Sequence, residues 1–89
     1  MKELETVKNF LELLEGVESV KNTSTKDYGA LDFIMVQTDT LNEIHKMPFT
    51  IVFHKDNTMA LFTQVFFELT IQCKSVKELT AIIQRIKID

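Results

Sequence analysis

The chain has 89 residues, 45% of them hydrophobic, and a formal net charge of −3. This combination fits a single folded domain over residues 1–89 and excludes a second domain or a disordered chain. No apolar run approaches 18 residues, and the N-terminal segment is acidic where a signal peptide is basic, so we expect a cytoplasmic protein without a membrane segment.

The first expected element is a helix over residues 2–15. Its apolar residues recur at helical spacing along one face: Leu4, Val7, Phe10, Leu11, Leu13 and Leu14. Gly16 follows the last of them, where a left-handed residue ends a helix. Residues 17–21 are either a short strand or the exit from this helix, and residues 22–27 form a polar loop.

The central part of the chain predicts strands. Apolar and polar residues alternate over residues 30–38 and again over 48–54, and the turn at 55–58 predicts a hairpin because Asp56 and Asn57 tolerate left-handed backbone. Residues 39–48 are expected to be a loop that ends at Pro48.

The alternating stretch from Met59 to Cys73 is too long for one straight strand. Its 15 residues would extend over about 50 Å, whereas a compact domain of this size is about 30 Å across. We expect a break at Thr63 and Gln64, which gives strands over 58–63 and 65–73.

The last element is a helix that begins after Ser75. Ser75 and Glu78 have the spacing of a capping box. An apolar stripe follows: Val76, Leu79, Ile82, Ile83 and Ile86. The sequence thus predicts an α+β fold with an antiparallel meander of about four to five strands, flanked by an N-terminal and a C-terminal helix on one face, in the order α-β(β)-β-β-β-α.

The second face of this sheet is more apolar than a face in water requires. Five large apolar residues fall on it: Ile34, Val36, Val52, Phe62 and Phe66. Three explanations stay open from the sequence. The sheet curls and partly buries this face, the face pairs with a second copy in a homodimer, or it binds another protein.

No constellation of reactive residues predicts an enzyme, a metal site or a cofactor. Asp39, Glu43 and His45 are close in sequence, but their spacing matches no common metal-ligand signature. The single cysteine, Cys73, excludes an internal disulfide and is in phase with inward-facing residues, so a buried thiol is expected.

The predicted function is that of a small cytosolic protein-binding domain, for which a phage-type inhibitor or accessory factor of a host complex is one form. Its partner-binding residues would be the five on the second face. A homodimeric structural or regulatory domain is the first alternative. The second is weak nucleic-acid binding through Lys46, Lys55 and Lys74, which the scattered lysines and the net charge disfavour. Abundant Lys, Asn, Ile and Phe suggest a low-GC bacterial or phage origin.

Overall fold

The computed structural model describes residues 2–63 and 69–86 of the chain. Two helices and five strands follow one another in the order α-β-β-β-β-β-α: α1 (Lys2–Leu13), β1 (Val17–Asn22), β2 (Gly29–Thr38), β3 (Ile44–Phe53), β4 (Met59–Thr63), β5 (Leu69–Cys73) and α2 (Val76–Arg85). All neighbouring strands are antiparallel and lie in chain order, β1-β2-β3-β4-β5. The predicted fold class is therefore confirmed.

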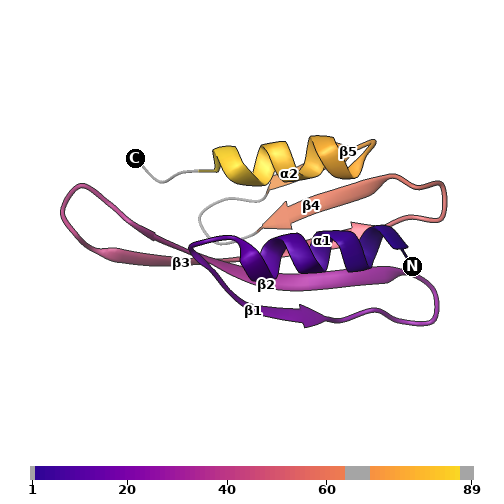
Figure 1. Cartoon of the computed structure of the whole chain (residues 1–89), viewed down its shortest axis with the longest axis horizontal. Coiled ribbons are helices and arrows are strands. Elements are labelled where there is room, and N and C mark those ends of the chain that lie inside the picture. Colours follow the sequence, from indigo (N-terminus) through magenta and orange to yellow (C-terminus); the bar gives the residue numbers. More distant parts are fainter. Residues whose placement is uncertain (1, 64–68, 87–89) are drawn as a thin grey trace.

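The domain has two layers, with both helices on one side of the sheet (Figure 1). Both helices end towards the hairpin that joins β2 to β3, and this hairpin extends beyond them. A hydrogen bond from the Gln37 side chain to the Ile86 carbonyl ties the end of α2 to the sheet there. Neither of the two helices within residues 2–63 and 69–86 covers the other side of the sheet.

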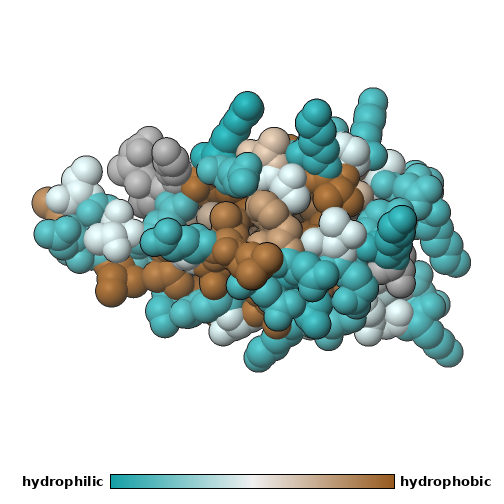
Figure 2. All heavy atoms as spheres, in the orientation of Figure 1, coloured by the Kyte–Doolittle hydropathy of each residue, from teal (hydrophilic) through white to brown (hydrophobic). Residues whose placement is uncertain are grey.

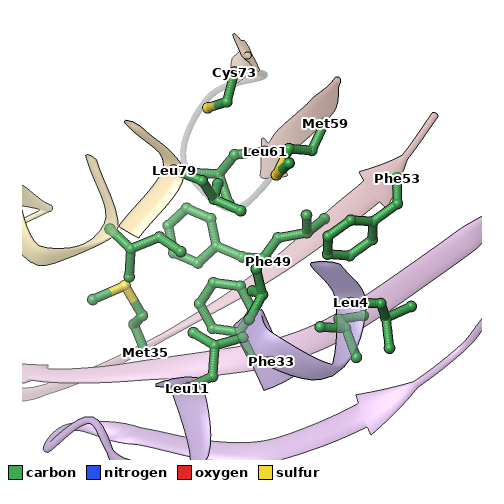
Figure 3. Close-up of a cluster of buried hydrophobic side chains, with 14 of the residues drawn as sticks. Leu4, Leu11, Phe33, Met35, Phe49, Phe53, Met59, Leu61, Cys73 and Leu79 are labelled. Carbon is green, nitrogen blue, oxygen red and sulfur yellow. The ribbon is translucent and has the colours of Figure 1, made fainter. Parts of the chain in front are cut away.

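The core lies between the helices and the odd-numbered residues of the sheet (Figure 3). Phe33 and Phe49, opposite each other on β2 and β3, stack with ring centroids 5.4 Å apart. Leu11 of α1 and Leu79 of α2 are fully buried against this layer. Successive side chains of a strand point to opposite faces of the sheet, so the even-numbered residues point away from the helices.

The short strand β1, which the sequence left open, contains a bulge. Its pairing with β2 shifts between Glu18 and Lys21, and Ser19 adopts a φ of 56°. Val17 and Val20 are three residues apart, so they would lie on opposite faces of a regular strand. The extra residue brings both valines onto the helix-covered side, where they pack against the core.

The prediction of a loop over residues 39–48 is wrong in its second half, because β3 begins at Ile44 and includes Pro48. Proline is accepted here because its carbonyl points towards β4, where it receives a hydrogen bond from the Thr63 hydroxyl at 3.0 Å. The amide position of the same residue faces the same way, so the missing N–H removes no bond to β2. The described pairing of β3 with β4 runs from Thr50 to Phe53.

The long alternating stretch is divided into two strands, as predicted. The strand β4 ends at Thr63, and β5 returns beside it with Thr63 opposite Leu69. The expected start of the second strand, residues 65–68, lies outside the described residues, and so does Phe66. The helix over 2–15 is shorter than predicted and ends at Leu13.

The predicted cap of the last helix is confirmed. The Glu78 amide donates to the Ser75 hydroxyl at 3.1 Å, so Ser75 is the N-cap of α2. The Glu78 carboxylate accepts from the amide of Lys74 at 3.2 Å, one residue before the cap. These two hydrogen bonds stabilise the turn between β5 and α2.

Candidate functional site: the open face of the sheet

We use the name open face for the side of the sheet that carries no helix. Among the described residues, its larger apolar side chains are even-numbered and come from β2, β3 and β4: Ile34, Val36, Ile44, Pro48, Val52 and Phe62. The register places Ile34 opposite Pro48, and Val36 beside them in the next row. Four of the five predicted binding residues thus share one surface, and the fifth, Phe66, lies outside the described residues.

These side chains differ in exposure. Ile34, Val36, Val52 and Phe62 are partly buried by their neighbours in the sheet. Ile44 is 67% exposed, and Pro48 is exposed as well. The apolar strip therefore becomes more accessible along β3 towards the projecting hairpin.

The core does not account for the open-face residues. The described core cluster, together with the partly buried residues packed against it, includes none of the six. Figure 2 shows the opposite, helix-bearing side, where apolar surface gathers between α1 and α2 and towards the hairpin. That surface has a structural explanation, because the partly buried Phe10, Leu14 and Ile82 pack against the core from the helices.

One polar pair lies at the centre of the open face. The Thr50 hydroxyl donates to the Asp32 carboxylate at 2.8 Å across β3 and β2. Phe62 on β4 lies opposite Thr50, and Lys21 on β1 lies opposite Asp32. This row therefore runs from an aromatic ring on β4 to a lysine on β1.

An ion pair crosses β2 on the same face. Glu18 on β1 lies opposite Ile34, and Lys46 on β3 lies opposite Val36, yet their charged atoms are 3.2 Å apart. Because the two residues lie on either side of β2, their side chains must pass over it. This arrangement shields Ile34 and Val36, and both charged groups remain well exposed.

A shallow depression of about 290 Å³ lies beside this ion pair. Its walls come from the β1 bulge and from β2 and β3: Ser19, Lys21, Asp32, Ile34, Pro48 and Thr50, with Phe33 and Phe49 at the base. The short side chains at Thr50 and Asp32 leave it hollow between bulkier neighbours. Its mixed lining of one carboxylate, one ammonium group and apolar walls suits a protein side chain.

The sequence reasoning missed Ile44 and Pro48 as members of the open face. It treated Pro48 as the end of a loop, which removed residues 44–47 from the strand. The signal was present, since Ile44, Lys46 and Pro48 continue the even-numbered positions of the strand. That continuation is possible because the ring nitrogen of Pro48 points away from β2, so no hydrogen bond to β2 is lost.

A network around Asp39 fixes the turn of the projecting hairpin. Its carboxylate accepts hydrogen bonds from the amides of Leu41 and Glu43, at 2.8 and 3.0 Å, and its second oxygen lies 2.7 Å from Nε2 of His45. The bond with His45, followed by the Glu43 amide, lowers the pKa of Asp39. The backbone of Asn42 is left-handed, with a φ of 62°. The network presents the end of β3 in one defined conformation.

The ligand atoms of Asp39, Glu43 and His45 lie within 4.8 Å of one another. Two carboxylates and an imidazole have the chemistry to hold a divalent transition metal. However, the Asp39 carboxylate already serves the turn through both of its oxygens. The geometry therefore explains the cluster as a turn-stabilising network.

Other residues considered from the sequence are separated in space. Cys73 is fully buried, as predicted, and burial raises the pKa of its thiol, with a further contribution from Glu78. His45 lies near the start of β3 and His54 follows its end. Lys46 and Lys55 are likewise at opposite ends of this ten-residue strand, so they do not form a common basic patch.

Comparisons of the chain with models of known families, with curated proteins and with solved structures find no match. Within residues 2–63 and 69–86, neither helix has the length and apolar character needed to cross a membrane. The open face is therefore interpreted from its own geometry.

Proposed function

We propose that this chain is a small cytosolic protein-binding domain and that the open face is its binding surface. The observation that carries the proposal is the position of the six apolar residues. They lie on the face without a helix, and they take no part in the described core.

The chemistry of the face supports a protein as the ligand. Apolar side chains lie among polar groups that already have partners, namely the Asp32–Thr50 hydrogen bond and the Glu18–Lys46 ion pair. Binding would thus bury apolar surface without leaving these charges unpaired. Phe62 is the only aromatic residue among the six, and aromatic residues commonly dominate the binding energy of such contacts.

The test is affinity capture with three forms of the chain as bait: the wild type, Phe62→Asp and Gln84→Asp. Gln84 is exposed on α2, so its substitution adds the same charge on the helix-bearing side. Each captured protein is then purified and its binding to the three forms is measured by calorimetry. We expect Phe62→Asp to weaken binding by at least about tenfold, which corresponds to about 1.4 kcal/mol. Equal binding by all three forms would refute the proposed surface.

A control keeps this result interpretable. Both variants must show the far-UV circular dichroism and the cooperative melting of the wild type. A variant that fails to fold is replaced by Val52→Lys, which changes the same face at a partly buried position beside Ala30 and Ala60.

A further inference from the structure

We propose that the occupant of the open face is a second copy of this chain, packed sheet against sheet in a symmetric dimer. The inference rests on the proposed function, because it names the partner of the same surface.

The charges of the open face suit self-association. Glu18 and Lys46 form an ion pair, and Asp32 lies opposite Lys21, so among the described residues of β1, β2 and β3 on this face two acids are balanced by two bases. In a two-fold contact each patch meets itself, so a face of one sign would repel its copy. Charges that are already paired within each copy reduce that repulsion.

The size of the molecule allows a contact of the kind that a stable dimer needs. The molecule measures 42 × 25 × 22 Å, and Figure 1 views it along the shortest of these axes. An ellipse with the two longer dimensions covers about 800 Å², and this outline is the upper limit of what one copy could bring to a flat contact. One partner in a standard protein interface contributes about that much, so the contact would have to use most of the face.

The shape of the face is also complementary to itself. Phe62 lies on β4, and the depression is centred near Asp32 and Ile34 on β2, so each is one strand away from β3 on opposite sides. A two-fold axis that runs along β3, between two facing sheets, exchanges these positions. Phe62 of each copy would then lie over the depression of the other.

This axis places the open-face residues of β3 near their own copies, from Ile44 to Val52. Lys46 is among them, and its charge is matched there by Glu18 of the same copy. Sheets that pack face to face lie about 10 Å apart and differ by about 30° in strand direction. The dimer would then be a four-layer sandwich, with the helices of both copies outside and the two sheets inside.

The first experiment measures mass by light scattering behind a sizing column, from about 1 µM to about 1 mM protein. We expect twice the 10.3 kDa of one chain at the upper end. Ile44→Lys and Leu13→Lys are the matched variants, because both replace an exposed aliphatic residue, 67% and 88% exposed, by the same charge. Ile44→Lys should raise the dissociation constant of the dimer at least about tenfold, and Leu13→Lys should leave it unchanged.

The second experiment tests the axis with cysteine variants and a short bis-maleimide that bridges facing sheets. Thr50→Cys should give a covalent dimer, and Gln84→Cys on the outside of α2 should not. The native Cys73 is fully buried and should not react in the folded chain. Cross-linking of Gln84→Cys alone would overturn the arrangement.

The outcomes separate this inference from the proposed function. A chain that stays monomeric at about 1 mM overturns the dimer. If such a monomer still binds a purified protein that Phe62→Asp does not bind, the proposed function stands. A dimer broken by Leu13→Lys but not by Ile44→Lys would place the contact on the helix-bearing side and would overturn the inference, while the capture experiment with Phe62→Asp would still decide the proposed function.

Discussion

Replacing Gly16 by alanine should destabilise the fold at the junction between α1 and the sheet. Gly16 has a φ of 86°, in the left-handed region that glycine adopts without penalty. It ends α1 and turns the chain into β1. Its carbonyl also accepts a hydrogen bond from the Val36 amide at 2.7 Å, which connects this turn to β2.

The expected loss follows from two features of this position. An alanine in left-handed backbone costs about 1–2 kcal/mol. In addition, its Cβ would lie 3.2 Å from the Val36 carbonyl oxygen, which must shift by a few tenths of an ångström. Because the Val36 amide is bonded to Gly16, that shift also disturbs the bond. We therefore expect a loss of about 1–2 kcal/mol, or about 4–16 °C in melting temperature for a domain of this size.

Urea and thermal unfolding, followed by circular dichroism, measure this effect. Gly16→Asn should lose less than Gly16→Ala, since asparagine tolerates left-handed backbone better. Glu15→Ala, at the neighbouring exposed residue, should change the free energy of unfolding by less than about 0.5 kcal/mol. If Gly16→Ala unfolds like the wild type, or if Gly16→Asn is the less stable of the two, the reasoning about this junction is wrong.

Three other predictions concern single residues. Ser75→Ala removes the N-cap of α2 and should lower the free energy of unfolding, measured by urea titration, by about 1 kcal/mol. An unchanged urea midpoint of unfolding would contradict this prediction. The pKa of Asp39 is lowered in the fold, so its contribution is present above the ordinary carboxyl value of 3.8 and is lost as pH falls through the lower folded value. The melting temperature of Asp39→Asn should therefore fall less between about pH 5 and about pH 2 than that of the wild type; parallel curves would contradict this role. The Cys73 thiol should react with a disulfide reagent only as the chain unfolds, and immediate reaction in native buffer would show that it is accessible.

The periodic elements could be predicted from the sequence because their patterns are local. The apolar spacing of α1 and α2, the Ser75–Glu78 cap and the turn at Asn57, whose φ is 69°, all depend on a few neighbouring residues. The need for a break followed from chain length, because a longer strand would not fit the domain. Its place followed from Thr63, the polar residue that interrupts the inward-facing series.

The features that the sequence did not predict, the bulge in β1 and the start of β3, depend on contacts with strands that are distant in the sequence. The bulge at Ser19 exists because Val17 and Val20 must both reach the core, and the spacing of the two valines did not define their register with β2. Pro48 is compatible with β3 because its backbone polar positions point away from β2, on the side where its carbonyl accepts from the Thr63 hydroxyl. The open face was predicted from the alternation of side chains along each strand. Its exposed apolar residues Ile44 and Pro48 were missed because residues 39–48 were expected to be a loop.

The most direct test of the open face as a binding surface is methyl-resolved nuclear magnetic resonance. Spectra are recorded as the chain is concentrated to about 1 mM, and again with any purified protein that it binds. We expect the methyl signals of Ile34, Val36, Ile44 and Val52 to shift together, while those of Leu11 and Leu13 on α1 stay in place. Shifts confined to the α1 methyl groups, or no shift in either series, would contradict the account.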